Sequence, residues 1–312
     1  MICNMAVKRF GTFEGVFTPT ILSILGVIMY LRLGWAVGSI GLGKALLIIA
    51  IGNIITIVTC LSMSSILTNI KIGAGGAYSI ISKSLGLEIG GAIGVPLYLS
   101  QAISVAFYIT GFTEAWISIF PLHSFLWVSL IAWSALLLIS YSSTKLAFRV
   151  QYLVMAIIGL SLISAFLGKG VIEQGVPLWH GASGASFWQV FAVIFPAVTG
   201  ILAGASMSGE LNDPKKNIPV GTLSAVGVSF LIYVLLSFWF ASNGSPQELV
   251  NNTSIIISLA KWKWLVIAGI FGATLSSALS MFVTAPRTLS ALGKHKIIPL
   301  SSFFGKVNDK NE

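Results

Sequence analysis

The sequence has little charge and few of the residues that build catalytic or metal sites. Only 9% of its 312 residues are charged, and it contains two cysteines and three histidines. Cys3 and Cys60 are too few for a disulfide framework, and His123, His180 and His295 are scattered rather than clustered like zinc ligands. We therefore expect no catalytic residues, no resident metal and no cofactor, so an enzyme is not expected.

What the sequence has instead is apolar side chain. Its hydrophobic fraction of 56% and mean hydropathy of +0.94 exceed what a soluble domain could cover with polar surface. A spanning helix needs about 20 mostly apolar residues. We therefore predict an all-α integral membrane protein, with one transmembrane domain over residues 1–312. Its eight candidate spans are 17–38, 44–68, 89–119, 124–142, 147–168, 187–208, 219–242 and 262–291.

The basic residues predict how the chain is oriented in the membrane. The net charge is +9, but the lysines and arginines lie in short loops between apolar runs, which is typical of membrane topology rather than of nucleic-acid binding. With the N-terminus inside, Arg32 lies within a span and only four basic residues lie outside: Lys44, Lys169, Lys261 and Lys263. An even number of spans then places both termini in the cytoplasm. We expect a cell-membrane protein that contacts the lipid bilayer and no nucleic acid.

Two of the predicted spans are interrupted where a membrane anchor would be continuous. The stretches "PTILSILGVIMYLRLGW" (19–35) and "FPAVTGILAGASMSGE" (195–210) each have a proline near the start and glycine further on. In a helix interior Gly costs about 1 kcal/mol and Pro about 3 kcal/mol against Ala. Unwound backbone in hydrocarbon is tolerated only where protein or a cavity satisfies it. Because these are the first and sixth spans, in equivalent places of two blocks of five, they indicate an inverted-repeat transporter.

The chemistry of such a break suits inorganic ions. Unpaired carbonyls at the end of one half can coordinate a cation, and unpaired N–H groups at the start of the other can hold an anion. Among acidic residues only Glu114 lies clearly in or near a span, whereas a proton relay usually needs a carboxylate in mid-membrane. Inorganic ions are therefore favoured over proton coupling. Alternatively, Gly26, Gly200 and Gly204 only permit close approach of helices.

Five segments together resemble a known family. They are "GVFTPTILSILGVIMYLRLGWAVG", "GGAYSIISKSLGLEIGGAIG", "VAFYITGFTE", "FPAVTGILAGASMSGELNDPKKNIPVGT" and "ATLSSALSMFVTAPRTLSAL". In this order they resemble the cation-chloride cotransporter family of the amino acid-polyamine-organocation superfamily. The resemblance implies a leucine-transporter-like inverted-repeat bundle with discontinuous helices one and six. The sequence stops after the eighth core helix, so we expect an incomplete second repeat, with a homodimer or helices supplied elsewhere as partners.

The resemblance also implies a potassium site and two chloride sites. Potassium is expected at first-helix backbone, a helix-three hydroxyl and helix-six oxygens, which here are Ser23, Ile24, Tyr108, Pro196 and Thr199. Chloride is expected at the N–H ends, which are Gly26, Val27, Ile28, Gly200, Ile201 and Leu202. Ser23 replaces the asparagine that is usual in the family, and Leu25 replaces a bulky aromatic residue. Judged without the family, Tyr108 would more often make an interhelical hydrogen bond and pack its ring.

A sodium site is implied where helix eight meets the first break. Its residues are Leu22, Leu25, Ala273, Ser276 and Ser277. Paired serines in a span more often pack or bond back to their own helix, but within the family this pair resembles the sodium-dependent branch. We therefore expect a sodium-potassium-chloride type of symporter that works by alternating access.

Two other classes of function stay open. An amino acid permease of the same superfamily would share the fold and would bind its substrate carboxylate where chloride is expected. Against it, the glycine-serine-glycine break that is common in those permeases is not seen in "LSILGVI". A channel or a nontransporting subunit is the second alternative, and ion flow without coupling would identify a channel.

Overall fold

The chain folds into helices that pack in layers. The computed structural model describes residues 10–69, 76–142, 144–170, 175–205 and 211–305. Within these residues the only β pairing is an isolated bridge between Phe10 and Leu211. The prediction of an all-α protein is therefore confirmed.

The helices follow one another with short connections. In chain order they are η1 (Phe13–Phe17), α1 (Thr18–Ile24), α2 (Val27–Leu31), α3 (Leu33–Ile40), α4 (Leu42–Asn69), α5 (Gly76–Leu85), α6 (Leu87–Ile119), α7 (Phe125–Ser142), α8 (Thr144–Phe166), α9 (Phe187–Ile194), η2 (Phe195–Val198), α10 (Leu202–Ala205), α11 (Pro214–Asn243), α12 (Pro246–Asn251), α13 (Ile255–Leu259), α14 (Lys263–Lys294) and α15 (Ser301–Phe304). The first predicted span is thus built from four short pieces, whereas α4, α6, α11 and α14 are long and continuous.

Six helical segments in the described chain are long and apolar enough to cross a membrane. They are Phe13–Leu31, Leu42–Leu67, Leu87–Ile119, Phe187–Ala205, Pro214–Asn243 and Lys263–Lys294. Two shorter apolar helices, Phe125–Tyr141 and Val150–Phe166, occupy the other two predicted segments. The chain is therefore a multi-pass membrane protein, while the count of eight spans stays a prediction. The end of the predicted span 187–208 and both predicted cytoplasmic termini lie outside the described residues.

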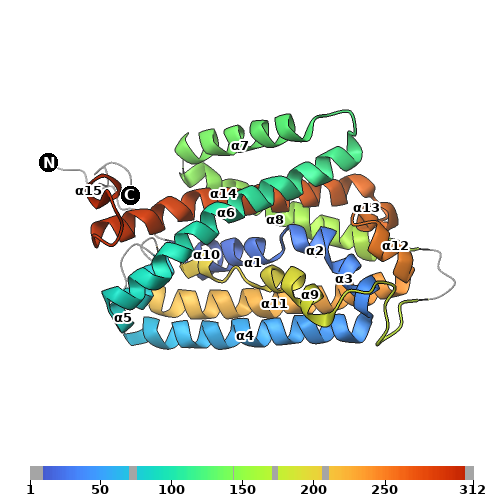
Figure 1. Cartoon of the computed structure of the whole chain (residues 1–312), viewed down its shortest axis with the longest axis horizontal. Helices are drawn as coiled ribbons and strands as arrows, with labels where there is room; N and C mark the ends of the chain where they lie inside the picture. Colours follow the sequence, from blue (N-terminus) through green and yellow to red (C-terminus); the bar gives the residue numbers. More distant parts are fainter. Residues whose placement is uncertain (1–9, 70–75, 143, 171–174, 206–210, 306–312) are drawn as a thin grey trace.

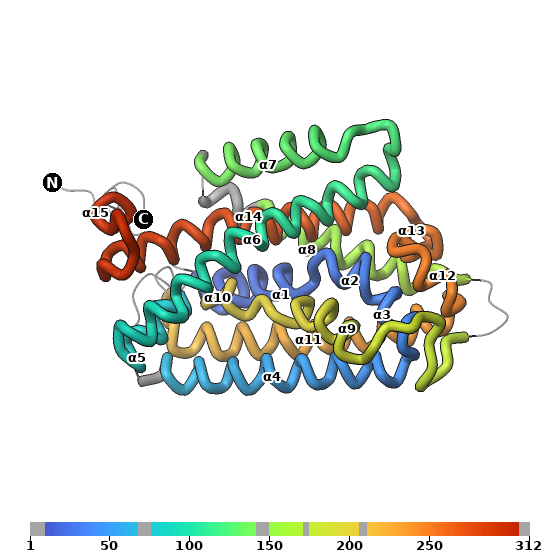
Figure 2. Tube along the Cα trace, in the orientation of Figure 1, coloured from blue at the N-terminus to red at the C-terminus, as the bar shows by residue number. Residues whose placement is uncertain are grey.

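The broken helices lie between two layers of continuous ones. In Figure 1, α4 and α11 lie side by side along one side of the molecule, and α14 crosses α6 and packs on α8 along the other. The short pieces α1, α2 and α10 run between these layers, as the trace in Figure 2 also shows, whereas α9 contacts α3 and α4 and exposes Trp188. Irregular backbone in a membrane must be enclosed by protein, and this arrangement encloses it.

Burial separates the enclosed helix from those at the periphery. In the apolar part of Phe13–Leu31, 89% of the residues are buried, against 22% for Leu87–Ile119. The peripheral helices expose large apolar side chains such as Leu126 and Trp127. Such a surface is stable when it faces lipid, so the burial pattern distinguishes lipid-facing helices from the central one.

A candidate ion-binding site between two helix breaks

The first break separates α1 from α2 at two residues. α1 ends at Ile24, Leu25 has a non-helical ψ of 52°, and Gly26 is extended with φ −92° and ψ −162°. A helix end leaves its last carbonyls without partners in the same helix, and a helix start leaves its first N–H groups free. The carbonyls of α1 and the N–H groups of α2 therefore face into the same short gap.

The second break lies after the 3-10 turn η2. Thr199 is extended, with ψ −173°, and Gly200 has a φ of +110° before α10 begins. A Cβ atom at position 200 would lie 3.0 Å from the Ser23 hydroxyl oxygen. Gly200 is needed here both for its positive φ and for this close approach. The contact also shows that the two breaks lie against each other.

The predicted sodium residues meet at the first break. The Ser277 hydroxyl in α14 donates a 3.3 Å hydrogen bond to the Leu22 carbonyl in α1. The Ser276 hydroxyl is buried and has no hydrogen-bond partner among the described residues, and Ala273 is fully buried beside it on α14. Ser277 thus bonds to another helix and not back to its own, and the role of the pair stays a prediction. Because buried hydroxyls are normally satisfied, the Ser276 hydroxyl, unpartnered within the described chain, is available as an oxygen ligand.

The predicted potassium residues also converge. The Thr199 hydroxyl donates to the Pro196 carbonyl over 2.7 Å. The Tyr108 ring lies 3.8 Å from where a Cβ of Gly26 would be. Its phenol faces the Ser23 hydroxyl, which is buried between the two breaks.

The predicted chloride residues lie where α2 and α10 start. Gly26 caps α2, which begins with Val27 and Ile28, while Gly200 and Ile201 lead into α10, which begins at Leu202. The side chains of Val27, Ile28 and Ile201 are buried, so the amide groups are the polar part of each turn.

The glycines near the breaks serve different purposes. A Cβ on Gly204 would lie 2.6 Å from both the Thr20 hydroxyl and a Val16 methyl group, so this glycine permits close helix approach. A Cβ on Gly26 would meet its neighbours only at 3.5 Å or more. Gly26 is therefore not required for close packing.

Two hydroxyl residues that the sequence analysis missed hold the break carbonyls. Tyr233 in α11 is fully buried, and its hydroxyl lies 2.9 Å from the Ile24 carbonyl and 3.4 Å from that of Ala197. Thr56 in α4 donates to the Val198 carbonyl over 3.1 Å. A buried tyrosine hydroxyl needs a hydrogen-bond partner. A tyrosine within the apolar span 219–242 therefore indicated a buried hydrogen bond, but the sequence did not show which groups accept it.

An ion pair lies at the C-terminal end of α2. Arg32, between α2 and α3, bonds to the Glu114 carboxylate of α6 over 2.9 Å, and both side chains are partly exposed. The sequence analysis noted both residues and did not predict their pairing. They line an open cavity of about 510 Å³ whose other residues are Leu31, Ile117, Ser118, Phe125, Thr253 and Ser254.

Comparison with known proteins agrees with the quoted motifs. The amino acid permease family model matches residues 15–312. Solute carrier family 12 member 2 is 33% identical in Mus musculus and 34% identical in Homo sapiens, each over 99% of this chain. Solute carrier family 12 member 8 of Xenopus laevis is 32% identical over 97% of the chain. The chain spans only 31%, 30% and 44% of the lengths of these three relatives, respectively.

Proposed function

Because this chain belongs to the amino acid permease family, within it to the cation-chloride cotransporters, we propose that it is a secondary active symporter. It moves chloride together with sodium, potassium or both by alternating access. The transported ions are its ligands, and it has no cofactor and no enzymatic reaction.

The observation that carries this proposal is the meeting of two helix breaks inside the protein. Ser23 of the first break lies against Gly200 of the second, and Ser277 reaches the Leu22 carbonyl from a third helix. Helix-end carbonyls and hydroxyls suit alkali cations, and helix-start amides suit an anion. No ionised side chain has to enter the gap, which matches the scarcity of acidic residues in the sequence.

Each group of residues then has one ion. We assign potassium to Ser23, Ile24, Tyr108, Pro196 and Thr199, and sodium to Leu22, Leu25, Ala273, Ser276 and Ser277. Chloride is assigned to the amides of Gly26, Val27, Ile28, Gly200, Ile201 and Leu202. Sodium coupling is supported by the buried serine pair, because a branch without these hydroxyls would lack two oxygen ligands.

Rubidium uptake into proteoliposomes tests the proposal. We expect rubidium uptake that needs both sodium and chloride. It should be electroneutral, because the transported cations are balanced by an equal number of chloride ions. Sodium is replaced by N-methylglucamine and chloride by gluconate, one at a time. Equal rubidium uptake in sodium gluconate would show that chloride is not coupled and would overturn the proposal.

Amino acid transport is the second candidate, because the matching family model is that of amino acid permeases. In that case the substrate carboxylate binds the amides that we assign to chloride. Uptake of a labelled amino acid that chloride inhibits would favour it. A current proportional to voltage, in which the flow of one ion does not require the presence of another, would favour a channel.

We also propose that the protein lies in the cell membrane with both termini in the cytoplasm, as the bias of basic residues indicates. Single cysteines in place of Lys44 or Lys263 would then react with an impermeant reagent added outside. A cysteine in place of Lys294 would be protected.

Assembly as a homodimer, or with helices from another chain, is a further proposal. Light scattering of the purified protein in detergent measures the mass of the assembly and so tests it.

A further inference from the structure

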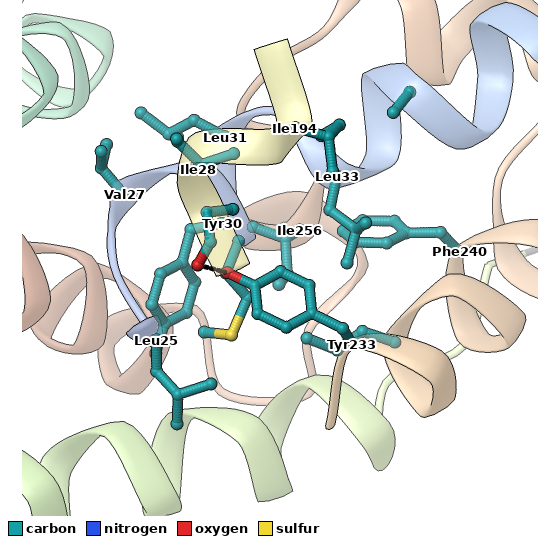
Figure 3. Close-up of a cluster of buried hydrophobic side chains, with 14 of the residues drawn as sticks. Leu25, Val27, Ile28, Tyr30, Leu31, Leu33, Ile194, Tyr233, Phe240 and Ile256 are labelled. Carbon is teal, nitrogen blue, oxygen red and sulfur yellow. Dashed lines mark hydrogen bonds between the residues drawn. The ribbon is translucent and has the colours of Figure 1, made fainter. Parts of the chain in front are cut away.

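Tyr233 places one hydroxyl between carbonyls of both broken helices. Its oxygen lies 2.9 Å from the Ile24 carbonyl of the first helix and 3.4 Å from the Ala197 carbonyl of the sixth. Both carbonyls belong to the last residues before a break, where partners within the same helix run out. The fully buried ring packs among apolar side chains and points toward the first-helix segment (Figure 3). Packing therefore sets the position of the hydroxyl.

A phenol has a single proton to donate. The shorter distance shows that Ile24 is the main acceptor, and the Ala197 carbonyl is a second acceptor within reach of a rotation of the hydroxyl. Tyr233 can thus keep one hydrogen bond when another positively charged group binds the Ile24 carbonyl. A residue that bonded only to Ile24 would lose its partner instead.

The Ile24 carbonyl is also one of the oxygens that the proposed function assigns to potassium. A hydroxyl hydrogen carries a partial positive charge and a potassium ion a full one, so they repel each other when they approach one oxygen in a site of low dielectric. A carbonyl oxygen has two lone pairs, so the two can coexist there only at an energetic cost. The hydrogen bond to Ile24 is therefore stronger in the carrier that holds no potassium.

We propose that Tyr233 is a positioning residue that holds the Ile24 carbonyl in the potassium-free carrier and turns its proton to the Ala197 carbonyl when potassium binds. This inference rests on the proposed function. It makes Tyr233 a link between the two breaks and a stabiliser of the carrier without potassium. Tyr233 therefore lowers the affinity for potassium and favours the return of the unloaded carrier.

The test compares Tyr233→Phe with the unchanged chain in proteoliposomes. Removing the hydroxyl removes the competitor for Ile24, so the rubidium concentration for half-saturation should fall by about twofold to tenfold. Net rubidium uptake should slow relative to rubidium–rubidium exchange, because exchange does not need the unloaded carrier to return. The sodium concentration for half-saturation should not change. A purely structural defect would lower net uptake and exchange together.

Tyr30→Phe is the matched control. Tyr30 is as deeply buried in the same cluster, but its hydroxyl bonds to Ser161 and not to a break carbonyl. This variant should leave the rubidium half-saturation unchanged. A fluorotyrosine at position 233 keeps the shape of the side chain and makes its hydroxyl a stronger donor, so it should raise the rubidium half-saturation. It keeps the test decisive if Tyr233→Phe does not fold.

The outcomes separate this inference from the proposed function. If the unchanged chain shows sodium- and chloride-dependent rubidium uptake while neither position-233 variant shifts its half-saturation, Tyr233 is structural and only the inference is wrong. The same holds if Tyr30→Phe produces an equal shift. If the unchanged chain shows no ion-dependent rubidium uptake, the proposed function fails and the inference fails with it.

Discussion

The breaks in the first and sixth helices differ in how the backbone turns. The first break is buried throughout and has a negative φ at both Leu25 and Gly26. The sixth break is less buried and turns through a positive φ at Gly200. Glycine is therefore required by backbone conformation only in the sixth break, although both breaks carry one at the same place in the sequence.

The two breaks agree in how their carbonyls are held. When "SILG" and "AVTG" are aligned on their glycines, Ile24 corresponds to Val198. The Ile24 carbonyl accepts from Tyr233 of α11, and the Val198 carbonyl accepts from Thr56 of α4. The broken helix of each block is thus held by the second helix of the other block, and α4 and α11 lie side by side. Such exchanged contacts tie the two blocks together.

The largest effect is expected from the serine hydroxyls of α14. Ser277 contacts the first break, and we describe no equivalent contact for the sixth. Replacing Ser276 or Ser277 with alanine should weaken sodium activation of rubidium uptake about 10-fold to 150-fold. A lost bond to a charged group is worth about 1.5 to 3 kcal/mol. Ser280→Ala is the control, since its hydroxyl bonds back to the Ser276 carbonyl of its own helix. Wild-type sodium dependence in both serine variants would make the pair structural and favour a potassium-chloride carrier.

The difference in backbone conformation predicts the next effect. Gly200→Ala should destabilise the protein by about 1 to 3 kcal/mol, because a side chain is strained at positive φ and would also crowd Ser23. Gly26→Ala should leave stability unchanged or slightly raised, because its φ is negative and a Cβ there would make only ordinary van der Waals contacts. Thermal unfolding in detergent, followed by tryptophan fluorescence, measures both. Equal losses at the two positions would contradict the comparison.

A smaller effect is expected from the hydroxyl that helix three directs at the breaks. Tyr108→Phe should raise the rubidium concentration for half-saturation by about threefold to tenfold, since one of several oxygen ligands is lost. The dependence on chloride should be largely kept, because its assigned ligands are amides. Tyr98→Phe, on the same helix and remote from the breaks, is the control. An unchanged rubidium response would assign Tyr108 to packing.

The smallest effect tests the hydroxyl that holds the sixth break. Thr56→Val keeps the shape of the side chain and removes its bond to Val198, which should destabilise the protein by about 0.5 to 1.5 kcal/mol. The loss is limited because the Thr56 hydroxyl is shared with the Gly52 carbonyl of its own helix. Thr59→Val, an exposed threonine bonded only within α4, should have no effect. Equal unfolding temperatures for the two variants would show that Thr56 does not support the break.

Much of the architecture could be predicted because it depends on composition and order. Apolar segments of sufficient length predicted the long helices, and the prolines and glycines of 19–35 and 195–210 pointed to the interruptions. The serine pair on helix eight was also expected beside Leu22, where the structure places Ser277. That expectation came from the family resemblance, since two adjacent serines in a span have several possible partners.

Contacts between distant residues could not be predicted in the same way. Tyr233 and Ile24 lie 209 positions apart, and Arg32 and Glu114 lie 82 apart. Nothing in the local pattern of α11 distinguishes an acceptor on the first helix from one on any neighbouring helix. The role of each glycine could not be predicted either, because the residue type alone does not determine whether φ is positive or negative.

The sequence by itself determined that this is a membrane protein, which spans are interrupted and which residue types stand at the interruptions. These follow from side-chain polarity and helix propensity, which are local properties. Only the tertiary structure decided that Ser23 meets Gly200, that Ser277 reaches Leu22 and that one hydroxyl of α11 serves two carbonyls. The physical reason is that a break leaves several backbone groups unpaired, and packing of whole helices selects which side chain satisfies each of them.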